Sequence, residues 1–260
     1  MPQRAVDESR PKPCGRARRG LARCGARGAR ALAAALSALL MSATAGADEL
    51  QPFEASYTWI WHGMTVAESR LKLERTGDTW TYSSTSEPRG LGRLLSERPK
   101  TVSVLKVTAA NVEPLSYKGD DGTGSTRRKV DVEYDWEKRR VTGVYEDAPV
   151  DLPLTPGVQD EASVQVALMV ELLRGRTPER FELLDKNSVR EYSYVREGKE
   201  TLKTPFGDVP TVIYRSHRAN SPHVNRYWCA PGRGYVPIRV EQKRGDDVQW
   251  IMEIRSLKRE

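Results

Sequence analysis

The residues best suited to acid–base chemistry are few and scattered in this sequence. Asp160 and Glu161 are adjacent carboxylates that could act as acid and base, although their place at the start of a helical pattern also explains them as partners of the helix dipole. His217 and His223 could face each other on paired strands and hold a metal together with a carboxylate. Two nitrogens do not complete such a site, so we expect no metal and no other cofactor, and we name no catalytic residue.

Motifs that carry nucleophilic or phosphate chemistry are missing from the sequence. It contains no G-x-x-x-x-G-K-[ST] loop, no G-x-S-x-G elbow, no H-E-x-x-H pair and no C-x-x-C pair. Beyond residue 47 the chain keeps a single cysteine, Cys229, in a run that is typical of a strand. We therefore interpret Cys229 as a small buried hydrophobic residue and not as a nucleophile.

The aromatic residues indicate a different kind of site. All six tryptophans lie beyond residue 47, and Tyr57, Trp59 and Trp61 fall on one face of an alternating segment. A concave sheet face lined in this way suits an apolar ligand such as an acyl chain, but the same residues also build an ordinary core. The candidate ligand-binding residues are Tyr57, Trp59, Trp61, Leu91, Leu94, Leu95, Leu168, Leu172 and Trp228.

The elements that would position these residues are mainly strands. Alternation of apolar and polar residues predicts ten or more of them, separated by short turns, which requires antiparallel pairing. We expect turns at 75–78, 120–122, 196–199, 231–234 and 245–247. The expected strands are 53–61, 65–74, 79–86, 101–108, 112–118, 130–136, 140–146, 189–197, 209–217, 224–230, 236–241 and 248–255.

One segment, 159–174, is helical by its apolar spacing, with acidic residues at its start and Arg174-Gly175 at its end. The sequence therefore predicts a mainly β fold: a single large curved antiparallel sheet, an open or half barrel, packed against one main helix. A second short segment, 88–97, has a leucine stripe between arginines. It could be a movable lip over a cavity or against lipid, or a turn that caps the core.

The N-terminal region is typical of a signal peptide. A basic stretch precedes the apolar run 31–42, which is too short to span a bilayer, and Ala45 and Ala47 satisfy the small-residue rule for cleavage. We expect residues 1–47 to be removed between Ala47 and Asp48, with a second cleavage position after Ala45, and residues 48–260 to form one β-rich domain in the periplasm. Arg18-Arg19 leaves twin-arginine export open beside the general route, and the long basic stretch could reflect a start codon placed too far upstream.

The net charge of +7 belongs to this region. The first thirty residues hold nine basic and two acidic side chains, and residues 31–47 hold none. Residues 48–260 therefore carry 33 basic and 33 acidic groups and are neutral overall. A neutral domain disfavours nucleic acid as a partner.

Short segments follow one another in a recognisable order along the chain. They are 53–57 (FEASY), 62–68 (HGMTVAE), 82–86 (YSSTS), 114–117 (PLSY), 134–136 (YDW), 159–160 (QD), 204–207 (TPFG), 227–231 (YWCAP) and 235–239 (YVPIR). Their order resembles the bacterial envelope family called domain of unknown function 3108. That resemblance implies an exported protein of Gram-negative bacteria without an assigned activity, so no catalytic residue can be carried over. The predicted shape also resembles the lipoprotein-carrier fold, a half barrel closed by helices.

From these observations we expect a periplasmic, non-enzymatic protein that binds a lipid, a lipidated protein or another apolar ligand on the concave face of the sheet. Two alternatives stay open. One is an envelope hydrolase that uses a carboxylate pair or His217. The other is a structural module that adds a strand to a partner at a sheet edge. The mature chain should have no transmembrane span, and its oligomeric state is open.

Overall fold

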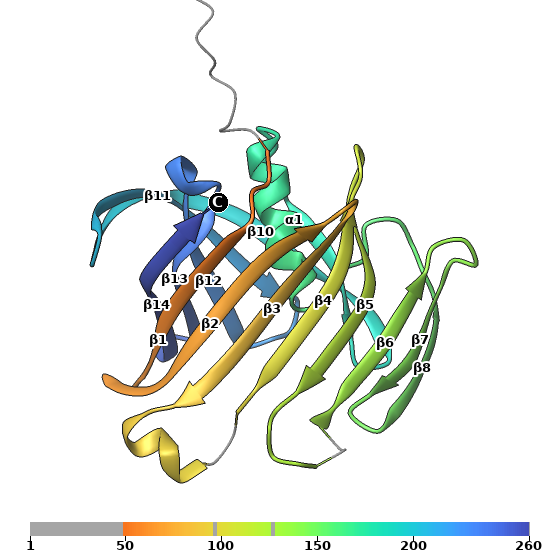
Figure 1. The fold of residues 1–260 in the computed structure, drawn as a ribbon, viewed down its shortest axis with the longest axis horizontal. Coiled ribbons are helices and arrows are strands. Elements are labelled where there is room, and N and C mark those ends of the chain that lie inside the picture. Colours follow the sequence, from red (N-terminus) through yellow and green to blue (C-terminus); the bar gives the residue numbers. More distant parts are fainter. Residues whose placement is uncertain (1–48, 96–97, 126–127, 260) are drawn as a thin grey trace, which may run out of the picture. The chain divides into compact units, whose positions relative to one another are not determined.

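Fourteen antiparallel strands form one sheet around a single α-helix in the part of the chain that the structure describes (Figure 1). A computed structural model describes residues 49–95, 98–125 and 128–259. The expected cleavage site, Ala47 and Asp48, lies outside these residues. The prediction of a mainly β fold with one large antiparallel sheet and one main helix is confirmed.

The strands alternate with short connections along the chain. They are β1 (Phe53–Trp61), β2 (Met64–Thr76), β3 (Thr79–Pro88), β4 (Lys100–Val107), β5 (Val112–Asp120), β6 (Val130–Asp135), β7 (Arg140–Tyr145), β8 (Ala148–Pro153), β9 (Arg180–Asp185), β10 (Ser188–Thr204), β11 (Gly207–Arg218), β12 (His223–Ala230), β13 (Val236–Arg244) and β14 (Asp247–Arg259). Two short 3₁₀ helices, η1 (Gly90–Leu95) and η3 (Pro231–Arg233), follow β3 and β12.

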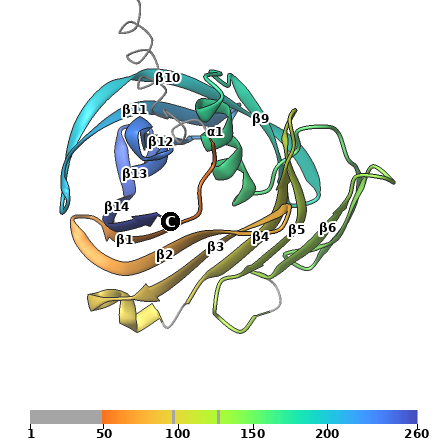
Figure 2. The ribbon, with the colours of Figure 1, turned by 45° about the horizontal axis from the view of Figure 1, so that its top comes forward.

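The sheet is a meander with one long-range joint. Each strand pairs with the next in sequence, except that β8 and β9 are the two edges and β1 pairs with β14 in the middle. The register at this joint runs from Phe53 opposite Arg259 to Ile60 opposite Ile251. The sheet curls around the helix without closing (Figure 2), because its two edge strands do not pair with each other.

Alternation along the strands decides which face of the sheet is buried. In β1, Phe53, Ala55 and Tyr57 are at most 3% exposed, while the residues between them are half-buried. Successive strand residues point to opposite faces, so the odd-numbered residues of β1 lie on the inner face, the one that carries the helix. Tyr57 donates its hydroxyl across this face to the carbonyl oxygen of Pro237 at 2.9 Å.

The helix, α1 (Ser163–Leu173), fills one end of the inner face. Nine of its eleven residues are buried, so it is apolar on nearly every side, as expected of a helix enclosed by a sheet and not laid on a surface. Val166, Met169 and Val170 pack in the main core, which takes residues from β1–β9 and β11–β14. Val164, Leu168 and Leu172 pack in a second core with strands β9–β12, which contains the thiol of Cys229.

Both open edges are partly blocked. The backbone of Gln159 bonds to β9 through its amide and its carbonyl, at 2.8 Å each, as a short parallel bridge. The opposite edge strand, β8, carries Pro149 and Pro153, which have no amide hydrogen to offer a partner strand. Lys186 and Glu146 join the two edges by an ion pair of 3.1 Å.

Three local predictions differ from the structure. Residues 196–199 are not a turn but the middle of β10, where Glu197 forms a bulge in an otherwise continuous ladder with β11. Strands β8 and β9 were not predicted, since their prolines, acidic residues and short length hide any alternation. The helix begins at Ser163, with Gln159 and Asp160 preceding it as an extended lead-in.

No helix in the described residues combines the length and apolarity that crossing a membrane requires.

Candidate ligand-binding face

A row of aromatic and polar side chains crosses the inner face of the sheet beyond α1. We call it the aromatic belt; it consists of Ser86, Ser69, Trp59, Trp250, Gln242 and Asn225, from six neighbouring strands, β3, β2, β1, β14, β13 and β12. Each of these residues lies two or four positions along its strand from a residue of the buried cores, which places the whole row on the face that carries α1.

Hydrogen bonds run along the belt in both directions, outward from the two tryptophans at its centre. Trp59 donates its ring N–H to Ser69 Oγ at 2.5 Å, and Ser69 bonds Ser86 at 2.5 Å. On the other side Trp250 donates to Gln242 Oε1 at 3.1 Å, and Gln242 donates to Asn225 Oδ1 at 3.1 Å. The two tryptophan rings meet in the middle with their centroids 4.6 Å apart.

Two exposed apolar side chains border the belt. We call them the apolar rim: Trp61 is 50% exposed and Met64 42%. Trp61 lies directly opposite Met64 in the pairing of β1 with β2. A bulge in β14 separates Val248 from Trp250 and places Val248 opposite Lys243, so Val248 is not part of the rim. The rim therefore continues the inner face of the sheet to its end, where solvent reaches it.

The backbone of η1 lies against β2 beside this rim. Arg89 donates its amide to the carbonyl of Val66 at 2.8 Å. A Cβ on Gly92 would lie 2.0 Å from the same carbonyl oxygen, so only glycine permits this approach. The position fits the predicted lip or capping turn. The side chains of Leu91, Leu94 and Leu95 lie outside what the structure describes.

The other predicted ligand-binding residues lie in four different environments. Trp59 belongs to the belt and Trp61 to the rim. Tyr57, Leu168 and Leu172 are 0%, 1% and 6% exposed, because protein already packs on them. Trp228 alternates with Tyr227 and Cys229, which face α1, so it lies on the opposite face, where its ring N–H bonds Glu200 at 2.6 Å. Four hollows of about 250 to 540 Å³ occur among the described residues, and none is lined by a predicted ligand-binding residue.

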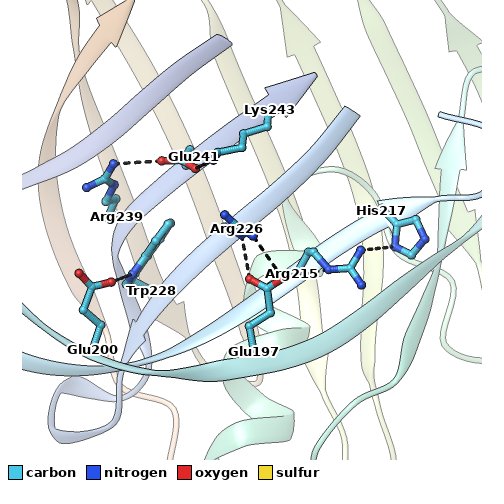
Figure 3. Close-up of polar contacts among 9 residues, drawn as sticks. All are labelled: Glu197, Glu200, Arg215, His217, Arg226, Trp228, Arg239, Glu241 and Lys243. Atoms are coloured by element: carbon cyan, nitrogen blue, oxygen red, sulfur yellow. Dashed lines mark hydrogen bonds and ion pairs between the residues drawn. The ribbon is translucent and has the colours of Figure 1, made fainter. Parts of the chain in front are cut away.

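The outer face of strands β10–β13 is occupied by ion pairs (Figure 3). Arg215 and Arg226 both contact the bulge carboxylate of Glu197, at 3.0 and 2.8 Å. On β13, Arg239 contacts Glu241 at 3.0 Å. These pairs hold each charge against an opposite one, so this face offers a ligand few free charges.

His217 belongs to this outer face. Its Nδ1 lies 3.3 Å from Nη1 of Arg215. His217 is opposite Val224 in the strand pairing, whereas His223 is opposite Arg244, so the two histidines do not face each other. Within the described ranges, no three His, Cys, Asp or Glu side chains are grouped so as to hold a metal ion.

The carboxylates of Asp160 and Glu161 are in different environments although they are adjacent. Asp160 is 1% exposed; its Oδ1 accepts the amides of Ala162 and Ser163 at 2.8 and 2.6 Å, and its Oδ2 accepts the hydroxyl of Ser103 at 2.7 Å. This is the geometry of a side chain that caps a helix. Burial raises the pKa of Asp160 to about 6, against the lowering effect of these bonds.

Glu161 remains accessible to solvent and accepts the hydroxyl of Tyr145 at 2.9 Å. Burial, with the nearby charges of Asp185 and Glu146, raises the pKa of its carboxyl.

Comparison with known proteins gives a family and a fold. The family model described as "Protein of unknown function (DUF3108)" matches residues 53–248. No curated protein matches the sequence. A solved beta-barrel-like protein of domain of unknown function DUF1849 from Brucella abortus is similar at 11% identity and a TM-score of 0.54, covering 82% of this chain and 99% of that one. A putative exported protein from Bacteroides fragilis with a YmcC-like fold, 13% identical, covers 81% of this chain and 97% of its own at a TM-score of 0.35.

Proposed function

Because this chain belongs to the DUF3108 family of proteins of unknown function, we propose its role from its own inner face: it is an exported, non-enzymatic protein that binds an acyl chain there. The acyl chain comes from a lipid or a lipidated protein, and it lies along the apolar rim and against the rings of the aromatic belt. The observation that carries this proposal is the continuous apolar surface formed by Trp61, Met64 and the paired rings of Trp59 and Trp250.

The hydrogen bonding of the belt favours an apolar ligand over a polar one. Both ring nitrogens, of Trp59 and Trp250, already donate to side chains within the belt. An acyl chain that covers these rings therefore leaves no polar group unpaired and gains from burial of apolar area, at about 25 cal/mol per Å². Exposed tryptophan and methionine are also enriched where proteins bind apolar partners.

The proposed location is the periplasm, after cleavage between Ala47 and Asp48. The sequence of residues 1–47 supports this, with its basic stretch, short apolar run and small residues. Leu50, three residues beyond Ala47, is 5% exposed and packs in the main core. Mass measurement of the protein from a periplasmic extract tests the proposal, and a chain that keeps residues 1–47 would contradict it.

The binding proposal is tested with acyl chains that carry bromine, which quench tryptophan fluorescence on contact. We expect saturable quenching, and at least tenfold weaker binding when Trp61 and Met64 are both changed to Ala. The matched control is Val144→Ala, since Val144 is also an exposed apolar side chain, 46% exposed, but lies on β7, seven strands from β14. Quenching that does not saturate, or that the double variant leaves unchanged, refutes binding at this face.

A further inference from the structure

Two adjacent carboxyls at the start of α1 meet a row of hydroxyls from four neighbouring strands. We call this row the hydroxyl row; it consists of Ser103, Tyr117, Tyr134 and Tyr145, from β4, β5, β6 and β7. All four residues are at most 5% exposed. Ser103 lies directly opposite Tyr117, and Tyr117 and Tyr145 lie opposite Val132 and Val130, on the same face of β6 as Tyr134.

Three members of the hydroxyl row have a carboxylate partner. Ser103 donates to Asp160 at 2.7 Å, and Tyr145 and Tyr117 donate to Glu161 at 2.9 and 3.4 Å. The fourth, Tyr134, is 5% exposed and its hydroxyl has no hydrogen-bond partner among the described residues. Tyr134 shares a face of the sheet with Tyr117 and Tyr145, the two tyrosines that bond Glu161. Burial, and after it the charges of Asp160 and Glu161, raise the pKa of Tyr134. A buried hydroxyl without a partner is costly, so its presence here points to a missing one.

Three carboxylates near Glu161 already have partners within the protein. Asp185 is paired with Arg218 at 2.6 Å and Arg190 at 3.2 Å, and Glu146 with Lys186 at 3.1 Å. The carboxylate of Asp160 accepts three hydrogen bonds, from the amides of Ala162 and Ser163 and from the hydroxyl of Ser103.

Glu161 differs from these three carboxylates. In the described part of the chain its bonds come from tyrosine hydroxyls and none comes from a lysine or arginine. Glu161 is also an exposed residue, whereas the adjacent Asp160 is 1% exposed.

We propose that Glu161 and the tyrosines of the hydroxyl row bind the primary ammonium group of a small organic cation, which donates its N–H groups to Glu161 and to the hydroxyl oxygen of Tyr134. The site is independent of the aromatic belt, since its hydroxyls and Glu161 come from β5–β7 and the start of α1, and none of them belongs to the belt.

The chemistry of the donor set selects this class of ligand. A divalent metal prefers several anionic oxygens, and the described residues contain no group of three acidic, histidine or cysteine side chains suited to one. The tyrosines direct hydroxyls to the carboxylate, so the site recognises N–H donors and not the methyl groups of a quaternary ammonium. An anion is repelled by Glu161 and by the nearby Asp160 and Asp185.

The probe is ethylammonium chloride, titrated into the full chain at pH 7.5 and followed by NMR of the protein, with tetramethylammonium and Ca²⁺ as comparison ions. We expect saturable binding of ethylammonium alone. Glu161→Gln removes the charge of the acceptor and should weaken binding about tenfold or more. Glu171→Gln is the matched control, because Glu171 lies at the other end of α1 and pairs with Arg176. It should bind as the parent does.

A second variant separates ligand binding from a purely structural role. Tyr134→Phe removes a hydroxyl that has no protein partner, so the melting temperature should stay equal or rise, while ethylammonium binding weakens several-fold. The proposal is overturned if ethylammonium shows no saturable binding, if Glu161→Gln or a folded Tyr134→Phe binds it as tightly as the parent, or if tetramethylammonium binds equally well.

Discussion

The buried carboxyl of Asp160 should make the protein less stable as its environment becomes less acidic. Its folded-state pKa is about 6, against an ordinary value of 3.8, because burial penalises the charged form more than its three hydrogen bonds favour it. Below pH 3.8 the carboxyl is protonated in both the folded and the unfolded state. Between the two values it is protonated mainly when folded, so raising the pH there lowers the free energy of unfolding.

The size of this effect follows from the two pKa values. Their difference, at about 1.4 kcal/mol for each pKa unit, corresponds to about 3 kcal/mol between pH 4 and pH 7. Exposed carboxylates act in the opposite direction. Hydrogen bonds from lysines are the main reason that the pKa values of Asp78 and Asp135 are lowered, so the stability that these two carboxylates add is lost as the pH falls. The effect of Asp160 must therefore be measured as a difference between proteins.

The assay is denaturant unfolding of the parent and of Asp160→Asn at pH 4, 5, 6 and 7. Asparagine keeps an oxygen for the amides of Ala162 and Ser163 but does not titrate. We expect the parent to gain about 3 kcal/mol relative to the variant as the pH falls from 7 to 4. Ser103→Ala should steepen the trend in the parent, since it removes a bond that favours the charged form. A parent-to-variant difference that is the same at pH 4 and pH 7 would refute the assignment.

Two further changes test the packing. Gly92→Ala should lower the free energy of unfolding by about 1–3 kcal/mol, since its Cβ would collide with the Val66 carbonyl. The control is Gly198→Ala, which has open space around it and should change the free energy of unfolding far less. Equal losses for the two variants in denaturant unfolding would contradict this reasoning. Burial raises the pKa of Cys229 to about 12, so its thiol should resist a thiol reagent at pH 8 until the protein is unfolded, and rapid labelling of the native protein would show that the interior opens.

Most of the strands and the fold class could be predicted from the sequence, because apolar and polar residues alternate wherever only one face of a strand is buried. Turns with strong signals, such as Gly77-Asp78 and Pro231-Gly232, separate strands as predicted. The same signal predicted a turn at 196–199, and this prediction is wrong. Glycine and charged residues allow a bulge as readily as a turn, and pairing with β11 favours the bulge.

The belt could not be derived from the sequence. Trp59 and Trp250 are nearly two hundred residues apart, and they meet only because β1 pairs with β14. The polar members, such as Gln242 and Asn225, occupy positions that alternation assigns to the buried face, which was the available signal that a polar site lies there. Glu161 and Tyr134 likewise come together through strand order, which composition does not encode.

The joint between β1 and β14 has a consequence for how the chain matures. Among the described strands β1 is synthesised first and β14 last, so one side of β1 has no neighbour until the thirteen residues of β14 have been added. Bringing such distant segments together is entropically demanding and slow. A polypeptide truncated before Asp247 exposes the ladders of both β1 and β13 at once, so proteases and holding chaperones can distinguish unfinished copies from complete ones by their bare backbone.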